Sequence, residues 1–149
     1  MIALIQRVSH ASVSVEGREI AATGPGLLVL LGVVRGDTAA EAIRLARKTA
    51  AMRIFPDSEG VMNLSVTESG GDILAVSQFT LAASVRRGNR PSYVAAAPGD
   101  EALPLYEEFC LQLEMLTGRQ VGRGVFGADM KVALTNDGPV TIIADTADF

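Results

Sequence analysis

The sequence predicts an α+β fold, in which a curved and mostly antiparallel sheet packs against about two helices. Short apolar runs bounded by glycine and other turn residues recur along the chain, as expected for strands, and only two segments carry a longer helical spacing. The 149 residues, of which 48% are hydrophobic, suit one core. No internal repeat or linker divides them, so we predict a single domain over residues 1–149.

The first third of the chain predicts three strands. Ile2 to Val8 has the composition of a strand, and Ala11 to Val15 alternates polar and apolar residues as a half-buried strand does. Glu16 to Glu19 is a plausible hairpin turn. Leu27 to Val33 is apolar at both odd and even positions, which face opposite sides of a strand. This pattern predicts a central strand covered on both faces.

The first helix is expected directly after Thr38. Thr38 and Glu41 have the spacing of a capping box, in which each side chain satisfies the backbone N–H of the other. Pro56 ends the segment. Its predicted apolar stripe is Ile43, Ala46, Ala50 and Ile54. Because charged residues take the other side, we expect a one-sided helix that packs on the sheet.

The middle of the chain predicts a short strand and then a buried one. Met62 to Val66 is the short strand, and Thr67 to Asp72 is expected to be a turn. The apolar run Ile73 to Val76 predicts a buried strand that ends at Ser77. Residues 84–92 have the composition of a loop.

A second helix is expected over Asp100 to Met115. Pro104 fits only the first turn of a helix, so we expect the helix to start two or three residues after Asp100. Gly118 is the expected C-terminal cap. The predicted buried stripe is Tyr106, Phe109, Leu113 and Leu116.

The end of the chain predicts two further strands. Gly122, Gly124 and Gly127 punctuate a run that precedes a strand from Met130 to Leu134. The segment Asn136-Asp137-Gly138 reads as a turn, and a last strand follows over residues 141–143.

Charge and cysteine content exclude several classes of protein. The net charge of −4 argues against a general nucleic-acid binder, but Arg86, Arg87 and Arg90 lie in a stretch without acidic residues and can engage phosphate locally. The single Cys110 forms no internal disulfide and anchors no zinc cluster; we expect it buried in a helix.

The chain carries no sign of a membrane or export segment. The longest apolar run, Leu27 to Val34, is far shorter than the roughly 20 residues of a membrane-spanning helix. The first residues lack the apolar centre of a signal peptide. We therefore expect a cytoplasmic protein that does not associate with membranes.

Much of the usual catalytic machinery is missing. The only histidine, His10, has no acidic neighbour in sequence, no group of residues has metal-ligand spacing, and no glycine-rich phosphate loop is present. The reactions that remain are those of an already labile bond, for which orientation and oxyanion stabilisation suffice.

Two motifs carry a resemblance to a known family. Ser77-Gln78-Phe79-Thr80-Leu81 follows the predicted buried strand, and Asn136-Asp137-Gly138-Pro139-Val140-Thr141 lies near the end of the chain. Together with the opening segment 1–8 they resemble the D-aminoacyl-tRNA deacylases, and the likeness covers nearly the whole chain. The resemblance implies a barrel-like sheet, a homodimer, and hydrolysis of the ester of D-aminoacyl-tRNA without metal or cofactor.

The resemblance also implies roles for particular residues. It assigns Ser77, Gln78, Phe79 and Thr80 to the catalytic pocket, where backbone N–H groups near Phe79 and Thr80 can hold the oxyanion while water attacks. Direct attack by the Thr80 hydroxyl is the alternative, but that hydroxyl needs a base that the sequence does not offer. Phe126 and Met130 are expected to line the pocket for the terminal aminoacyl-adenosine, although both can equally be core residues.

The second motif is expected to select the enantiomer. In the family resembled, the bond matched by Gly138-Pro139 is a cis peptide whose carbonyls enter the partner subunit's pocket and exclude an L side chain, while achiral glycine passes. Arg7 is expected to brace this backbone. Without the resemblance, an ordinary turn is the default interpretation. Two other functions stay open: a small-molecule esterase or peptidase that uses Thr80 as nucleophile, and a non-catalytic RNA-binding module.

Overall fold

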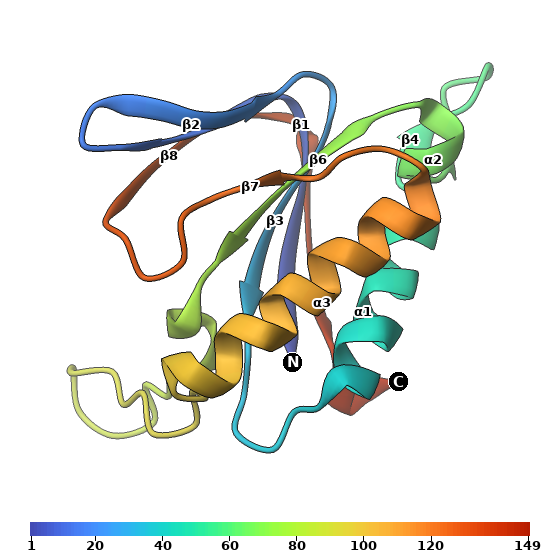
Figure 1. Ribbon diagram of the computed structural model, residues 1–149. Helices are drawn as coiled ribbons and strands as arrows, with labels where there is room; N and C mark the ends of the chain where they lie inside the picture. The colour runs from blue at the N-terminus through green and yellow to red at the C-terminus, as the bar shows by residue number, and fades with distance from the viewer.

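The computed structural model describes residues 1–149, and a six-stranded sheet lies at its centre (Figure 1). The strands run in the order β2-β1-β3-β6-β7, and β8 pairs with the other side of β1. They are β1 (Ile2–Val15), β2 (Arg18–Thr23), β3 (Gly26–Gly32), β6 (Asp72–Ser77), β7 (Gly122–Arg123) and β8 (Met130–Asp145). A separate two-stranded sheet joins β4 (Phe55–Pro56) to β5 (Met62–Leu64).

The helices are α1 (Ala39–Ala51), the short α2 (Val66–Ser69) and α3 (Gly99–Thr117), with 3-10 turns η1 (Phe79–Ala82) and η2 (Thr146–Asp148). The structure therefore confirms the predicted α+β class.

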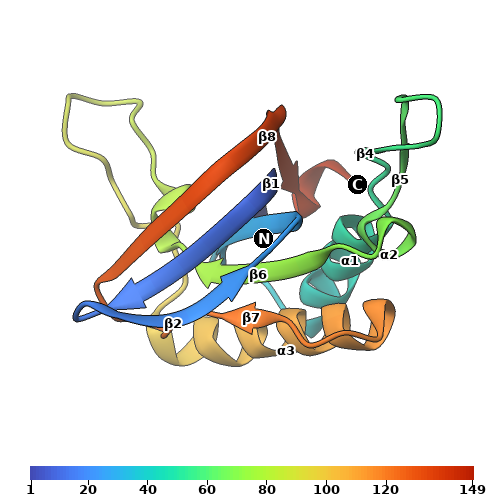
Figure 2. The ribbon, with the colours of Figure 1, turned by 90° about the horizontal axis from the view of Figure 1, so that it is seen from above.

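The main sheet is mostly antiparallel and strongly curved. Strand β1 pairs antiparallel with β2, β3 and β8, whereas β3 with β6 and β6 with β7 are parallel. The curvature brings β2 back towards β7 (Figure 2). A Cβ atom added at Gly122 would lie 3.6 Å from the Cβ of Ala21. The sheet thus forms a nearly closed barrel, as the resemblance implies.

Helices α1 and α3 lie against each other and cover one side of this sheet (Figure 1). Leu45 of α1 and Phe109 of α3 are fully buried with Ile5 and Leu27 from the strands in one hydrophobic core. Cys110 is buried beside them, as predicted. None of the helices combines the length and the hydrophobicity that a membrane-spanning segment requires.

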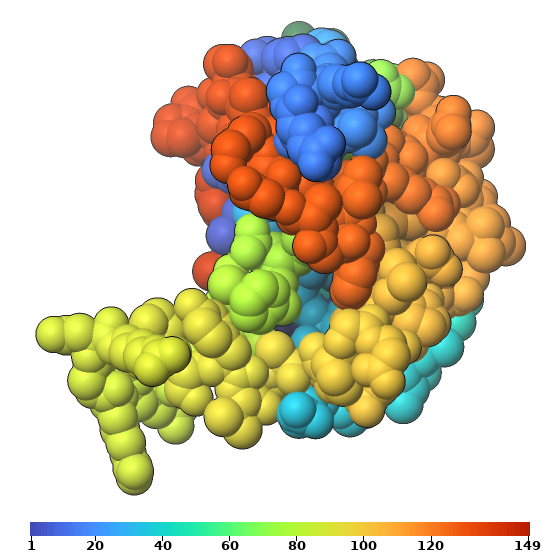
Figure 3. All heavy atoms as spheres, turned by 60° about the vertical axis from the view of Figure 1, so that its left-hand side comes forward, coloured from blue at the N-terminus to red at the C-terminus, as the bar shows by residue number.

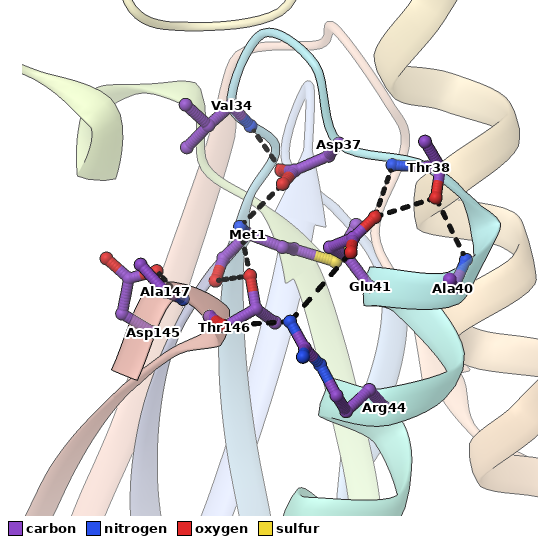
Figure 4. Close-up of polar contacts among 10 residues, drawn as sticks. All are labelled: Met1, Val34, Asp37, Thr38, Ala40, Glu41, Arg44, Asp145, Thr146 and Ala147. Atoms are coloured by element: carbon purple, nitrogen blue, oxygen red, sulfur yellow. Dashed lines mark hydrogen bonds and ion pairs between the residues drawn. The ribbon is translucent and has the colours of Figure 1, made fainter. Parts of the chain in front are cut away.

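The capping box at Thr38 is present. The Thr38 hydroxyl accepts from the N–H of Ala40, and the Glu41 carboxylate accepts from the N–H of Thr38 at 2.8 Å. Hydrogen bonds from Thr38 hold the pKa of Glu41 below its usual value. Figure 4 shows the neighbouring contact, in which the ammonium of Met1 donates to Asp37 at 2.8 Å and to Thr146 at 2.7 Å. This cluster ties β1 and η2 to the start of α1.

The buried face of α1 differs from the prediction. The residues that α1 buries are Ala42, Leu45, Ala46, Thr49 and Ala50. Ile43 is only partly buried, and Ile54 lies beyond the end of the helix. Ala46, Ala50 and Ile54 are buried as predicted. The buried face is wider than predicted on the side of Ala42, Leu45 and Thr49, and the helix packs closely against α3.

The two strands predicted before residue 16 form one strand. Ser9 and His10 are both exposed, which broke the expected alternation, and the register with β8 shifts between Val8 and His10. A β-bulge absorbs this extra residue. Because β8 pairs with β1 on both sides of the bulge, the strand continues.

A short helix was not expected after β5. Strand β5 ends at Leu64, and the predicted turn contains α2 instead. Ser65 accepts from the N–H of Glu68, and the Glu68 side chain accepts from the N–H of Ser65. The spacing of Ser65 and Glu68 in the sequence is that of a second capping box.

The start of α3 was also predicted wrongly. The helix begins at Gly99 and contains Pro104 beyond its first turn. Pro104 is exposed, so the Asp100 carbonyl that loses its hydrogen bond can be hydrated. Tyr106, Phe109 and Leu113 are buried as predicted, but Leu116 is 41% exposed. Gly118 caps the helix with a φ of 66°, as expected.

Candidate active site

A cavity of about 480 Å³ opens where β6 ends. Its walls come from the ends of β3 and β6, the first turns of α3, and the segment that leads into β8. Eleven of its 16 lining residues are hydrophobic. Such a mostly apolar cavity with a few polar groups at one end is typical of a small-molecule or substrate site.

The first sequence motif forms the polar end of this cavity. Ser77, Gln78 and Phe79 line it, whereas Thr80 does not. The Gln78 N–H donates to the Leu31 carbonyl at 2.7 Å, which extends the pairing of β6 with β3 by one residue. The chain then turns into η1.

Gly32 lets η1 approach the sheet. A Cβ atom at this position would lie 2.9 Å from the Cβ of Leu81 and 3.0 Å from the Gln78 carbonyl oxygen. Any side chain here would push η1 away from β3. The position of the motif therefore depends on a glycine in the neighbouring strand.

Two backbone N–H groups of the motif are free. The first hydrogen bonds of η1 are donated by Leu81 to Gln78 and by Ala83 to Thr80, while the N–H groups of Phe79 and Thr80 find no acceptor in the protein. The start of a helix leaves such donors without partners. Both are available to an anionic or carbonyl oxygen.

The hydroxyl of Thr80 is held by its neighbour. Gln78 Nε2 donates to Thr80 Oγ1 at 2.5 Å. An amide cannot accept the proton of a hydroxyl nucleophile as a base would. The hydrogen of the Thr80 hydroxyl remains free to be donated elsewhere.

Aromatic side chains form the walls of the cavity. Phe79 is 57% exposed at the rim and contacts Tyr93 edge-on, with ring centroids 5.2 Å apart. Phe126 lies 6.1 Å from the ring of Tyr106 and, like Met130, lines the cavity. The structure thus brings Phe126 and Met130 to the first motif.

Tyr106, predicted only as a core residue, also lines the cavity. Its hydroxyl donates to the Ala75 carbonyl at 2.9 Å, and burial raises the pKa of Tyr106 well above its usual value. The signal was a tyrosine within an apolar stripe, since a buried phenol needs a hydrogen-bond partner.

The second motif forms a bulge on β8 and not a chain-reversing turn. Gln6 pairs with Thr141 and Val8 with Asn136, so the four residues 137–140 lie opposite Arg7 alone. The peptide bond between Gly138 and Pro139 within this bulge is cis. The predicted turn is therefore wrong: the chain continues in the same direction as one strand.

Side chains close the base of the bulge. Asn136 Nδ2 donates to the Val140 carbonyl at 3.0 Å, and Asn136 Oδ1 accepts from the Val140 N–H at 2.8 Å. Arg7 Nε donates to the Asp137 carbonyl at 2.8 Å, and its Nη1 donates to the Ile54 carbonyl at 2.6 Å. Arg7 does contact this backbone.

The structure leaves the bulge outside the cavity of its own chain. Arg7, Gly138 and Pro139 are absent from the cavity lining, whereas five other predicted site residues line it. Pro139 and Gly138 lie on the exposed side of β8. Within one chain, the first motif thus lies at the cavity and the second motif lies away from it.

A strand end with free backbone donors beside an apolar cavity is typical of hydrolases that stabilise an oxyanion. Comparison with known proteins agrees with this class. A family model described as D-Tyr-tRNA(Tyr) deacylase matches residues 4–145. The chain belongs to the D-aminoacyl-tRNA deacylase family.

Individual relatives are similar over their whole length. A D-aminoacyl-tRNA deacylase of Roseiflexus castenholzii is 59% identical over 149 residues, which is 100% of this chain and 94% of the relative. One from Phocaeicola vulgatus is 53% identical, covering 98% of this chain and 97% of the relative. A solved structure named c-Myc DNA unwinding element binding protein superimposes with a TM-score of 0.92 at 41% identity, covering 98% and 99% of the two chains.

Proposed function

We propose that this protein hydrolyses the ester bond of D-aminoacyl-tRNA and releases the free D-amino acid and tRNA. The observation that carries the proposal is the pair of unpartnered N–H groups at Phe79 and Thr80, beside an apolar cavity, in a member of this family. Glycyl-tRNA, whose amino acid lacks a side chain, is also expected to be cleaved. Acting on aminoacyl-tRNA, the enzyme would work in the cytoplasm.

In the proposed mechanism, water attacks the ester carbonyl of the aminoacyl-adenosine at the tRNA 3′ end. The carbonyl oxygen becomes an oxyanion that accepts from the two N–H groups, and each well-placed donor of this kind contributes about 3 kcal/mol. The intermediate collapses as the ribose oxygen leaves and takes up a proton. This route requires neither a cofactor nor a metal ion.

Thr80 supports this route better as a donor than as a nucleophile. Its oxygen accepts from the Gln78 amide at 2.5 Å, which leaves its hydrogen to be donated to substrate or water. The apolar walls formed by Phe126 and Met130 suit the adenine or the aminoacyl side chain.

A homodimer would complete each site. Strand β8 pairs only with β1, and its other edge is open for 16 residues. Leu134 and Ile143 are 37% and 69% exposed there. A long, exposed and partly apolar edge strand favours association with a second copy.

The bulge on β8 would then supply the chiral selection in trans. In this proposal the main-chain carbonyls of Gly138 and Pro139, held in place by Arg7, enter the partner's cavity. A rigid wall at one substituent of the α-carbon collides with an L side chain and leaves a D side chain unopposed. Discrimination thus comes from repulsion and not from an added contact.

The experiment is to measure hydrolysis of D-tyrosyl-tRNA and L-tyrosyl-tRNA side by side, in the presence of a chelator. We expect rapid loss of the D ester alone. Equal loss of both esters would leave an esterase without chiral selection, and loss of neither would refute the proposed activity.

The Gly138→Ala variant tests the chiral selection proposed for the second motif separately from the hydrolysis proposed for the first. An added Cβ would lie 2.6 Å from the Val140 nitrogen, so the bulge must shift. We expect this variant to retain D-ester hydrolysis and to cleave the L ester faster than the wild type does. Gly24→Ala, where the added Cβ meets nothing within 4 Å, is the matched control.

A further inference from the structure

A strongly basic loop stands beside the cavity and has no part in the site described above. Residues 84–92 form this loop, which two hydrogen bonds between Ser84 and Ser92, of 2.8 and 2.9 Å, close at its base. In Figure 3 the loop projects from the body of the protein, next to the segment that carries the first motif. None of its residues lines the cavity.

The loop is anchored to the cavity on both sides. It leaves the body two residues after η1, whose first residue, Phe79, lines the cavity. On its return, Tyr93 contacts the ring of Phe79 at the rim, and Ala97 lines the cavity itself. A ligand that fills the cavity and extends past Phe79 therefore meets this loop next.

The charge of the loop is unbalanced. Arg86, Arg87 and Arg90 are all exposed, and none of them forms a salt bridge or a hydrogen bond within the protein. No acidic residue lies between Asp72 and Asp100. Three free guanidinium groups are thus concentrated on nine residues of a chain whose net charge is −4. Guanidinium groups bind phosphate oxygens in a bidentate manner.

Several other arginines of the protein are engaged within the fold. Arg119 pairs with Asp72, Arg123 pairs with Glu114 at 3.0 Å, and Arg7 binds backbone carbonyls. These contacts occupy each guanidinium group within the fold. The contrast makes the loop the part of the cavity's surroundings that is best suited to an external anion.

We propose that the loop binds backbone phosphates of the nucleotides that immediately precede the terminal aminoacyl-adenosine of the substrate. This inference rests on the proposed function. Each arm of the loop, at about four residues, reaches at most roughly 13 Å from the body, which suits neighbouring nucleotides and not the distant parts of a tRNA. Its contacts carry no sequence information, so they position the 3′ end of any tRNA.

The experiment compares the wild type with the variant R86Q/R87Q/R90Q on two substrates. With D-tyrosyl-tRNA we expect KM to rise about tenfold and kcat to stay within about twofold, because the ester and the oxyanion donors are untouched. With D-tyrosyl-adenosine, which lacks the preceding phosphates, we expect equal kcat/KM for both proteins. Three lost phosphate contacts should also flatten the slope of log(kcat/KM) against log salt by about 2.

The matched control is R18Q/R47Q/K48Q, which removes the same charge from exposed residues that do not line the cavity. An equal rise of KM in this control would attribute the effect to net charge and overturn the proposal. So would an unchanged KM in the loop variant, or an equal loss of activity of that variant on D-tyrosyl-adenosine.

A binding measurement separates failure of this inference from failure of the proposed function. If the wild type cleaves neither ester, the proposed function fails. The loop is then tested by fluorescence anisotropy with an RNA oligonucleotide that ends in CCA and carries no amino acid. A Kd about tenfold weaker in the loop variant than in both the wild type and the control supports phosphate binding, and equal Kd values refute it.

Discussion

Arg7 donates its Nε hydrogen to the main-chain carbonyl of Asp137 at 2.8 Å, and so holds the first residue of the β8 bulge to the middle of β1. The same guanidinium reaches the Ile54 carbonyl through Nη1. The side chain of Arg7 is only 12% exposed. One planar group therefore connects three separate segments of the chain.

The first prediction concerns this connection. Lysine lacks the planar fork that presents Nε and Nη1 to the two carbonyls, so Arg7→Lys should lose at least one of these hydrogen bonds and lower the free energy of unfolding by about 1–3 kcal/mol. In the proposed function it should also raise hydrolysis of L-tyrosyl-tRNA relative to the D ester, because the bulge loses its support. Urea unfolding and the two ester rates measure these effects. Arg18→Lys, at an exposed position, is the control; a variant indistinguishable from it would show that Arg7 does not brace the bulge.

The second prediction concerns Thr80. Replacement by alanine keeps the backbone N–H, so Thr80→Ala should reduce kcat/KM for D-tyrosyl-tRNA by less than about tenfold. Loss of one oxyanion donor would cost about 10²–10³. Steady-state rates together with mass spectrometry of quenched reactions provide the measurement. An inactive variant and an acyl adduct on wild-type Thr80 would instead support a threonine nucleophile.

The third prediction concerns the contact of β3 with η1. Gly32→Ala would place a Cβ atom 2.9 Å from that of Leu81, so η1 must move and the two free N–H groups move with it. We expect kcat to fall by at least about tenfold, and overpacking to cost about 1–3 kcal/mol of stability. Thermal unfolding and kcat are compared with Gly24→Ala, which should be neutral. A fully active Gly32→Ala enzyme would mean that the site does not depend on the position of η1.

The fourth prediction concerns pH. Burial raises the pKa of Cys110 from 9.0 to about 11. Between these values the unfolded chain releases the thiol proton while the folded protein keeps it, so the free energy of unfolding should fall as pH rises from about 9 to about 11. The slope from this group is at most about 1.4 kcal/mol per pH unit. Guanidinium unfolding of the wild type and of Cys110→Ala over this range provides the measurement. The variant should show the shallower slope, and identical slopes would contradict the assignment.

Local signals in the sequence were sufficient for the central elements. The run that starts at Leu27, apolar on both faces, identified β3, and the capping box at Thr38 identified the start of α1. Both signals depend only on residues that are close together in the sequence. The strand that ends at Ser77 was found in the same way. The cavity wall formed by Phe126 and Met130 came from the family resemblance, since no local pattern distinguishes it from core.

The incorrect predictions concern segments whose structure depends on contacts with distant parts of the chain. Asn136 to Val140 has the composition of a turn, but β8 pairs with β1 on both sides of it, so the strand continues and these residues form a bulge. A hydrogen bond from Arg7 to Asp137, 130 positions away, completes it. Strand structure depends on such partners more than on intrinsic preference. Pro104 was misjudged for a related reason, since packing of α3 outweighs one lost hydrogen bond.

The pairing of β1 with β8 can form only late during synthesis of the chain, because β8 lies close to the C-terminus. About 6 to 26 s separate the two strands at the ribosome, at roughly 5–20 residues per second. During this interval the side of β1 that β8 later occupies has no partner within the chain. Contacts of such high sequence separation are slow to form, and an open strand edge invites association with other nascent chains. The barrel can reach its final form only after nearly the whole polypeptide has been made.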